Sequence, residues 1–291
     1  MSVTKGIILA GGKGTRLFPS TAVICKPLLP VYDKPMIYYP LSTLIQAGIS
    51  DILMITTPSN VSHFDALFGD GSHLGLNISY EAQNKPLGIA HAFIVGEQFI
   101  GDDPVALILG DNIFFGDNNY LASVSEFSGG AQVYAVEVKD PERFGIVEFD
   151  ELGQTLSIEE KPNQPKSNFA VVGLYIYEPS VIEVAGGLKP SERGELEITH
   201  VNEVYLGRNQ LRTVRLPDDT TWIDAGTGDS MLEASYAISR HESKTGRKVG
   251  CIEEAAFLQG RIDAAQLMNI AADMPESPYR EYLEKLAAER K

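Results

Sequence analysis

The stretch that decides the fold is GIILAGGKGTR at residues 6–16, followed ten residues later by Lys26 and Pro27. It begins with a short apolar run between glycines, which is typical of a strand buried on both faces of a parallel sheet. The glycines that follow permit backbone angles closed to other residues and let amide N–H groups approach phosphate oxygens closely. Because Arg16 and Lys26 add positive charge, the stretch predicts a strand that leads into a phosphate-binding loop.

The spacing of these glycines excludes two familiar nucleotide-binding motifs. A dinucleotide fingerprint requires G-x-G-x-x-G, but Leu17 stands where the third glycine is needed. A P-loop requires G-x-x-x-x-G-K followed by Ser or Thr, and the sequence contains no such string. For the loop taken alone, a tight strand-to-helix turn with solvated basic residues stays open as the alternative.

Strand-like and helix-like patterns alternate over the first 110 residues. The expected elements are strands at 6–9, 52–56, 76–81 and 105–109, and helices at 36–47, 61–67 and 89–99. The alternation predicts an α/β fold with a mixed, mainly parallel central sheet flanked by helices. Such sheets bind ligands beyond the carboxyl ends of their strands, where the glycine loop and Gly110-Asp111 would both lie.

The pattern changes twice further along the chain. Near residue 132 shorter β-type segments begin, and antiparallel strands are expected there. The expected elements of this part are strands at 133–138, 145–149, 156–160, 170–177 and 211–216, and a helix at 198–206. Beyond Gly228 the sequence is helical in character. The predicted division is a domain at 1–229, with halves of about 1–130 and 131–229, and a C-terminal helical region at 230–291.

Composition and charge narrow the class of protein. Hydrophobic residues make up 44% of the 291 residues and charged residues 22%, as in ordinary globular proteins. The formal net charge of −15 argues against nucleic-acid or anionic-membrane partners, because those select basic patches. We expect neither a signal peptide nor a transmembrane segment, since no apolar run approaches about 20 residues. Two distant cysteines, Cys25 and Cys251, favour a reducing cytoplasm.

Several separated motifs follow one another in an order that indicates a family. They are LAGGKGTRL (9–17), KPLLPV (26–31), KPMI (34–37), PLSTL (40–44), FGDGS (68–72), LGDNI (109–113), FGIVE (144–148), EEKP (159–162), WIDAG (222–226) and GRIDA (260–264). Together they resemble the sugar-1-phosphate nucleotidyltransferases over essentially the whole chain, and most closely the longer members that use dTTP. The resemblance implies a Rossmann-like nucleotidyltransferase fold with a C-terminal helical extension.

The resemblance also implies a reaction: transfer of dTMP from dTTP to α-D-glucose 1-phosphate, giving dTDP-glucose and pyrophosphate by direct in-line displacement. No protein nucleophile is needed, because the sugar phosphate already carries an anionic oxygen. Since the reaction joins two anions, positioning and electrostatics supply most of the catalysis. A divalent metal that bridges phosphate oxygens is the usual device, and Mg²⁺ suits carboxylate ligands.

Two aspartates are the candidate metal ligands. Asp111 follows an apolar strand, and Asp224 follows Trp222-Ile223 at the end of a second one. By resemblance this pair binds Mg²⁺. For either aspartate taken alone, a turn or a helix cap is the alternative interpretation.

The resemblance divides the catalytic cations between the two substrates. Arg16 and Lys26 would bind the nucleotide phosphates, and Lys161 would hold the phosphate of the sugar. A solvated surface lysine stays open as the alternative for Lys161. The implied nucleotide-binding residues are Gly11, Gly12, Lys13, Gly14, Thr15, Arg16, Lys26, Gln83, Gly88 and Asp111.

Base and sugar recognition are assigned by the same resemblance. Gln83 and the backbone of Gly88 would read the pyrimidine edge, with Gly11 against the deoxyribose. Leu87 stands where many bacterial relatives have an acidic residue, so use of UTP or of several nucleotides stays open. Phe144 replaces a common tyrosine. The implied sugar-phosphate residues are Leu109, Asn112, Gly145, Glu160, Lys161 and Val171.

In the longer relatives the C-terminal region packs at subunit contacts and helps form a regulatory nucleotide site. The matching segments here surround Phe114, Gly116, Glu253 and Glu254, so the resemblance implies a homotetramer with such a site. A plain helical cap over the core is the alternative. The five histidines show no metal-ligand spacing, and we expect surface or helix positions for them and no role in the mechanism.

Two further classes of function stay open at this stage. A non-catalytic nucleotide-sugar sensor could keep the fold, although it would not need Arg16, Lys26, Asp111, Lys161 and Asp224 together. An NAD-dependent oxidoreductase is disfavoured by the glycine spacing.

Overall fold

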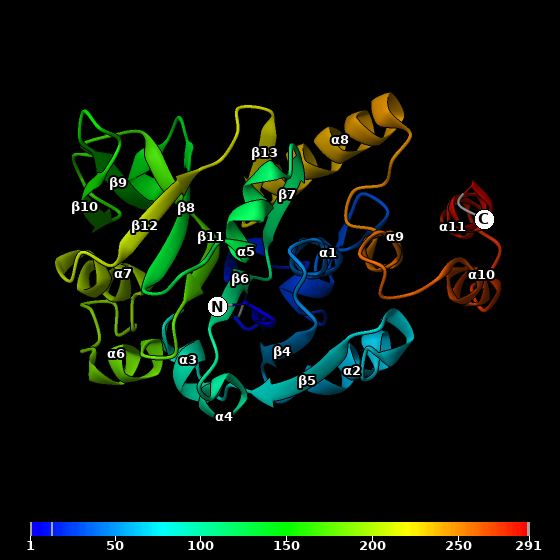
Figure 1. Ribbon diagram of the computed structural model, residues 1–291, viewed down its shortest axis with the longest axis horizontal. Coiled ribbons are helices and arrows are strands. Elements are labelled where there is room, and N and C mark those ends of the chain that lie inside the picture. Colours follow the sequence, from blue (N-terminus) through cyan, green and yellow to red (C-terminus); the bar gives the residue numbers. More distant parts are fainter. Residues whose placement is uncertain (1, 13, 290–291) are drawn as a thin grey trace.

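The computed structural model describes residues 2–12 and 14–289 (Figure 1). Within them the main element is a nine-stranded sheet with the order β10-β9-β11-β6-β1-β4-β5, which β8 and β12 extend from β11. Its parallel strands are β1 (Lys5–Leu9), β4 (Asp51–Thr56), β5 (Asn77–Ala82) and β6 (Val105–Leu109). Because β4 and β6 both pair with β1 in parallel, and β5 pairs with β4 in the same way, the predicted parallel first half is confirmed.

The strands β1, β4 and β6 are buried on both faces, which explains their continuous apolar runs, whereas most residues of the edge strand β5 are exposed. Ile8 packs in one core with Leu41, whereas its neighbour Ile7 packs in a second core with Phe93. The helices that supply these cores are α1 (Tyr38–Gln46), α2 (Val61–Phe68), α3 (His91–Val95) and α4 (Glu97–Ile100). The first two contribute to the core of Ile8, and the last two contribute to the core of Ile7.

One predicted helix is wrong in its extent. The segment 89–99 forms two short helices, α3 and α4, that meet at Gly96. A Cβ atom on Gly96 would lie 3.0 Å from Cδ1 of Ile7 and 3.2 Å from Cδ2 of Leu53. Glycine therefore lets this segment approach the sheet closely, at the point where the helix is interrupted.

The second half of the sheet is mainly antiparallel. Its strands are β8 (Ala131–Glu137), β9 (Gly145–Phe149), β10 (Thr155–Glu160), β11 (Phe169–Tyr177) and β12 (Leu211–Arg215). The expectation of antiparallel strands is wrong for one pair, because β12 runs parallel to β8. The chain leaves β11 through α6 (Val181–Gly187) and α7 (Ile198–Gly207), and β12 then starts at the end of the sheet where β8 also starts.

One edge of β11 is divided between two partners, and this division positions the site. Residues 174–177 pair with β6, whereas Phe169 and Ala170 pair with β9. Residues 171–173 lie between these partners. Where the two sheet halves diverge, β7 (Asn112–Gly116) leaves the end of β6 and pairs with β13 (Thr220–Asp224) as a separate antiparallel ribbon.

Two smaller features complete the N-terminal part of the chain. A short antiparallel pair is formed by β2 (Pro30–Val31) and β3 (Lys34–Pro35). The helix α5 (Ala122–Ser125) follows β7 and precedes β8.

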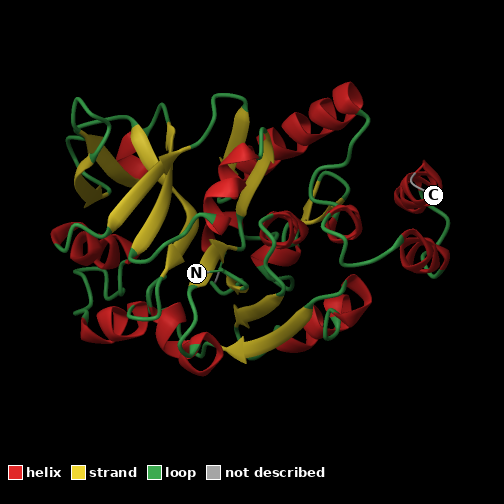
Figure 2. Cartoon of the chain, viewed as in Figure 1, coloured by secondary structure: helices red, strands yellow, loops and turns green. Residues whose placement is uncertain are grey.

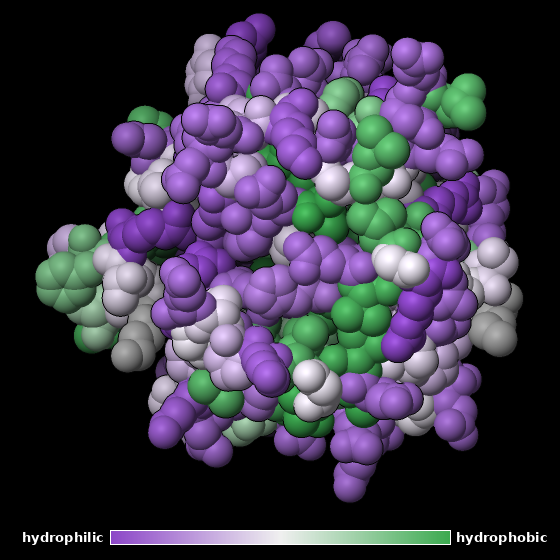
Figure 3. Space-filling view, turned by 90° about the vertical axis from the view of Figure 1, so that its left-hand side faces the viewer, coloured by the Kyte–Doolittle hydropathy of each residue, from purple (hydrophilic) through white to green (hydrophobic). Residues whose placement is uncertain are grey.

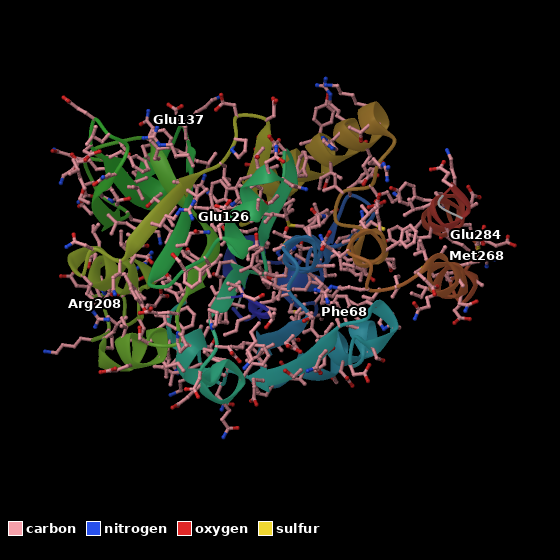
Figure 4. The ribbon with its side chains drawn as sticks, viewed as in Figure 1. Phe68, Glu126, Glu137, Arg208, Met268 and Glu284 are labelled. Carbon is pink, nitrogen blue, oxygen red and sulfur yellow. The ribbon has the colours of Figure 1, made fainter. Side chains whose placement is uncertain are left out.

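The C-terminal part of the described chain is helical, as predicted (Figure 2). Its helices are α8 (Gly228–Thr245), α9 (Ile252–Leu258), α10 (Ala264–Ala272) and α11 (Pro278–Glu289). Thr227 and Ser230 form a capping box that begins α8. Figure 4 labels Met268 on α10 and Glu284 on α11, at the end of the molecule farthest from α7. Among the described helices, none combines the length and hydropathy needed to cross a bilayer.

Candidate active site

Two carboxylates that are 113 positions apart in sequence meet beside the divided edge of β11. Asp224 ends β13 opposite Asn112, the first residue of β7, and the N–H of Ala225 donates to the carbonyl oxygen of Asp111 over 3.0 Å. The register of this ribbon therefore brings Asp111 and Asp224 together. The ammonium of Lys26 forms an ion pair with Oδ2 of Asp111.

The charged residues around Asp224 shift its pKa in opposite directions. Burial, and then the negative charge of Asp111, raise the pKa of Asp224. The positive charges that oppose this rise are those of Lys26, Arg16 and Arg143. Arg16 is close to the pair, since a Cβ atom on Gly226 would lie 3.2 Å from its Nη2 and from both carboxylate oxygens of Asp224.

This donor set fits a magnesium ion. Mg²⁺ is commonly held by one or two carboxylates together with substrate phosphates and water, and a cation between Asp111 and Asp224 would offset the mutual repulsion that raises the pKa of Asp224. The described residues contain no group of three or more His, Cys, Asp or Glu side chains arranged for a metal. Phosphate oxygens and water would therefore have to supply the remaining ligands.

Asn112 connects the carboxylates to the sheet. Its Oδ1 accepts from the N–H of Gly173 at 2.9 Å and from Nε1 of Trp222 at 2.7 Å, and its Nδ2 donates to Oδ1 of Asp111 at 2.9 Å. The side chain is 2% exposed. Because only one N–H of this amide is left over, Asn112 orients Asp111 and has little capacity left to bind the sugar, for which the resemblance implied it.

The first of two adjoining cavities, which we call the nucleotide cavity, measures 340 Å³. It lies beyond the carboxyl ends of β1, β5 and β6, as a parallel sheet predicts. The residues predicted for nucleotide binding that line it are Gly11, Gly12, Arg16, Lys26, Gln83, Gly88 and Asp111.

Of the three other residues predicted for this site, Gly14 and Thr15 do not line the cavity, and Lys13 is not described by the structure. Gly14 adopts a φ of 56° and precedes a 3₁₀ turn at Thr15–Leu17, which carries Arg16. A Cβ atom on Gly14 would lie 2.8 Å from Cγ2 of Thr21. Gly14 and Thr15 therefore position Arg16 from outside the cavity, and Lys13 lies outside the described residues.

Gly88 also borders the nucleotide cavity, and only glycine fits there. Its φ is +102°, and a Cβ atom would lie 2.3 Å from the carbonyl oxygen of Leu196. The segments around the two residues are joined by backbone hydrogen bonds from Leu196 N–H to Leu87 O, at 2.7 Å, and from Ala90 N–H to Leu196 O, at 3.1 Å. The segment around Gly88 is therefore tied directly to the segment that leads into α7.

The second cavity, which we call the sugar cavity, measures 460 Å³. All six residues predicted for the sugar phosphate line it: Leu109, Asn112, Gly145, Glu160, Lys161 and Val171. Oε1 of Glu160 pairs with Nζ of Lys161 at 3.2 Å, and Oε2 accepts from the hydroxyl of Thr199 at 2.5 Å. The side chain of Lys161 is 44% exposed. Both Glu160 and Lys161 thus reach the cavity, although Glu160 is already engaged by protein groups.

Charged residues that were not predicted also line the sugar cavity. The guanidinium of Arg193 contacts Oε1 of Glu160 at 3.1 Å and Oε2 of Glu197 at 2.8 Å. Burial alone would raise the pKa of Glu197, but hydrogen bonds from Arg193 and Ser191 lower it. Arg143 lies over the ring of Phe144, 5.1 Å from its centroid. No local motif marks these residues, because it is the fold that brings Arg193 to Glu160.

The two cavities adjoin and share lining residues. The shared residues are Arg16, Ile89, Leu109, Asp111 and Glu195. Arg16 and Asp111, both predicted as site residues, therefore lie on the boundary between the nucleotide cavity and the sugar cavity. In Figure 3 the molecule is turned so that the side with α7 and β10 faces the viewer, and this face is mainly hydrophilic with a hydrophobic area near its centre. Two substrates placed in the two cavities would meet at Arg16 and Asp111.

A third cavity of 890 Å³ lies away from this site, between β7 and the C-terminal helices. Phe114, Phe115, Gly116 and Glu254 line it, as do Arg247 and Lys248. Glu253 does not line it. Glu253 is only 4% exposed, and its carboxylate accepts from the hydroxyl of Tyr279 at 2.5 Å.

Comparisons with known proteins agree with this geometry. The model of the family described as nucleotidyl transferase matches residues 5–241. The chain is 52% identical to the glucose-1-phosphate thymidylyltransferase of Mycolicibacterium smegmatis, covering 97% of this chain and 98% of the relative. It is 49% identical to the enzyme of the same name from Neisseria meningitidis, covering 97% and 99%.

Solved structures lead to the same group of proteins. A Bacillus anthracis protein, assigned as a glucose-1-phosphate thymidylyltransferase and crystallised with sucrose, matches with a TM-score of 0.75 and 43% identity, covering 80% of this chain and 94% of that one. A UDP-glucose pyrophosphorylase in complex with UDP-glucose matches with a TM-score of 0.72 and 27% identity, covering 82% and 99%. The chain therefore belongs to the nucleotidyl transferase family, and within it groups with the glucose-1-phosphate thymidylyltransferases.

Proposed function

We propose that the protein transfers dTMP from dTTP to α-D-glucose 1-phosphate in a Mg²⁺-dependent reaction that yields dTDP-glucose and pyrophosphate. The observation that carries this proposal is the pair of adjoining cavities with Arg16 and Asp111 on their boundary. One cavity offers glycine backbone and Gln83 for a nucleotide, and the other offers Glu160 and Lys161 for a phosphorylated sugar. Relatives with about 50% identity carry the name of this reaction.

In the proposed reaction an oxygen of the sugar phosphate attacks the α-phosphorus of dTTP while pyrophosphate leaves from the opposite side. Lys161 holds the attacking phosphate in place. Arg16 and Lys26 stabilise the negative charge that grows on the departing pyrophosphate. Asp111 and Asp224 would hold Mg²⁺, which neutralises phosphate charge when bound.

Release of pyrophosphate tests this proposal directly. The purified protein is incubated with Mg²⁺ and glucose 1-phosphate, and with dTTP, UTP, dCTP or ATP in turn. We expect pyrophosphate with dTTP that depends on both glucose 1-phosphate and Mg²⁺. Binding of dTTP without any release of pyrophosphate would instead favour a non-catalytic nucleotide-sugar sensor.

A second candidate is the same reaction with UTP. It is favoured by the 27% identity to a UDP-glucose pyrophosphorylase bound to UDP-glucose and by Leu87, which is 39% exposed at a position where the family resemblance implied an acidic residue. Thymine and uracil share the edge that Gln83 would read, so the bases differ only in the methyl group. Turnover with UTP equal to or greater than that with dTTP would overturn the preference for dTTP.

The proposal also includes a homotetrameric, cytoplasmic enzyme with a regulatory nucleotide site, and the third cavity supports the regulatory site. Arg247 and Lys248 supply positive charge for phosphates, and Phe114 and Phe115 supply apolar surface. We expect saturable binding of dTDP-sugar by a variant whose active site is blocked, and a tetramer in light scattering. Absence of this binding would contradict the regulatory site. A monomeric mass in light scattering would contradict the tetramer.

A further inference from the structure

Gln83 is the side chain in the nucleotide cavity best placed to recognise a base. It follows β5, is 5% exposed, and its backbone N–H donates to the carbonyl oxygen of Thr56 at 2.7 Å. Its amide oxygen Oε1 lies 3.4 Å from where a Cβ atom on Gly11 would be. The backbone is thus fixed, and the orientation of the amide decides which polar groups face the cavity.

His91 forms a hydrogen bond with the nitrogen of the Gln83 side-chain amide. Nε2 of Gln83 lies 2.7 Å from Nδ1 of His91, the first residue of α3. An amide nitrogen can only donate, so Nδ1 of His91 must accept and the ring proton must reside on the other nitrogen. Burial lowers the pKa of His91, and no charged side chain contributes to this shift, so the ring is neutral at pH 7. The sequence predicted surface or helix positions for the histidines, and His91 does begin a helix.

We propose that His91 is a positioning residue for base recognition, because it binds one N–H of Gln83 and thereby turns Oε1 and the second N–H of that amide toward the nucleotide. Reversing the amide would require the ring proton of His91 to move to Nδ1. In this orientation the free side of the amide would accept from a ring N–H of a base and donate to the neighbouring carbonyl oxygen of that base.

This pattern selects a base by its chemistry. Thymine and uracil present N3–H next to a carbonyl oxygen, which matches the amide in both positions. Cytosine presents an unprotonated N3 next to an amino group, so acceptor would face acceptor and donor would face donor. The inference deepens the proposed function, on which it rests for the identity of the nucleotide. It predicts that His91, which lines neither the nucleotide cavity nor the sugar cavity, controls the preference for dTTP over dCTP through Gln83.

Two substitutions separate the positioning role from a merely structural one. His91→Phe keeps a planar ring but removes the acceptor, whereas His91→Asp supplies an atom that can only accept. His63→Phe, on an exposed turn of α2, is the matched control. Binding of dTTP and of dCTP is measured by calorimetry, and kcat and KM are measured with each nucleotide and glucose 1-phosphate.

We expect the wild-type protein and the His63→Phe and His91→Asp variants to prefer dTTP over dCTP, and the His91→Phe variant to lose about tenfold of that preference. The loss should lie in the KM for the nucleotide and not in the KM for glucose 1-phosphate. An unchanged preference in His91→Phe, or an equal loss in His91→Asp, would overturn the role of His91. If the wild-type protein binds dTTP selectively but releases no pyrophosphate, the proposed function fails while calorimetry still decides the role of His91.

Discussion

The nucleotide cavity and the sugar cavity adjoin, yet they are built in different ways. The nucleotide cavity lies at the ends of parallel strands and is formed largely by loop backbone, with glycines at positions 11, 12 and 88. The sugar cavity lies at the ends of antiparallel strands and is formed by paired charges such as Glu160 and Arg193. The first therefore depends on backbone that only glycine can form and the second on paired charged side chains, and each of the following substitutions tests that difference.

The largest effect is expected at the boundary between the cavities. Asp111→Asn should lower kcat by about a thousandfold, because both cavities share this carboxylate and it is one of the two proposed metal ligands. The measurement is pyrophosphate release over a magnesium titration, with circular dichroism to check folding. An unchanged magnesium dependence would remove Asp111 from the ligand set.

Smaller effects, each mainly on one substrate, are expected for substitutions of Lys161 and Arg16. Lys161→Ala should raise the KM for glucose 1-phosphate by about a hundredfold, because this lysine lines only the sugar cavity. Arg16 lines both cavities, but Arg16→Ala should act more on dTTP, since the proposed reaction assigns this guanidinium to the departing pyrophosphate. Steady-state kinetics with both substrates varied will separate the two, and equal losses for both substrates in both variants would contradict the division.

Gly88→Ala tests the backbone construction of the nucleotide cavity. The new Cβ atom would collide with the carbonyl oxygen of Leu196, so we expect the KM for dTTP to rise about tenfold and the free energy of unfolding to fall by about 2 kcal/mol. Gly194→Ala is the matched control, because Gly194 also has a positive φ, +76°, but nothing lies within 4 Å of its added Cβ. Similar results for both variants would show that positive φ alone accounts for the loss.

The smallest effect concerns the charge network of the sugar cavity. The folded protein lowers the pKa of Glu197 below its usual value of 4.5, so this carboxylate stabilises the fold above about pH 4.5. That contribution is lost as the pH falls through the lower pKa of the folded state. Glu197→Gln should therefore reduce the free energy of unfolding by about 1 kcal/mol at pH 7, and by progressively less in acid.

Urea unfolding at several pH values measures this difference. Glu195→Gln is the control, because Glu195 is 44% exposed and lies 3.8 Å from the same arginine, Arg193. A loss in Glu197→Gln that is independent of pH would mean that packing rather than charge accounts for it.

The comparison also explains which features could be predicted from the sequence. Gly11 and Asp111 lie beyond the carboxyl ends of parallel strands, as predicted, because the ligand edge of a parallel sheet follows from the alternation of strands and helices. The ribbon between β7 and β13 that brings Asp224 to Asp111 was not predicted, since its pairing joins segments more than 100 residues apart.

Side-chain partners were harder to predict than positions. Asn112 lies where expected, but its amide is occupied by Trp222 and Gly173, which no sequence pattern indicates. Arg193 and His91 act through contacts made only in the folded chain, with Glu160 and Gln83 respectively. Motifs therefore located the loops, whereas the tertiary fold determined what each side chain contacts.

A crystal structure of the protein with dTDP-glucose and Mg²⁺ tests the central claim most directly. The account predicts the thymine in the cavity beside Gln83, the glucose in the cavity beside Glu160, and the diphosphate between them next to Arg16, with the metal on Asp111 and Asp224. A ligand confined to one cavity, or a diphosphate bound away from Arg16 and the two aspartates, would contradict it.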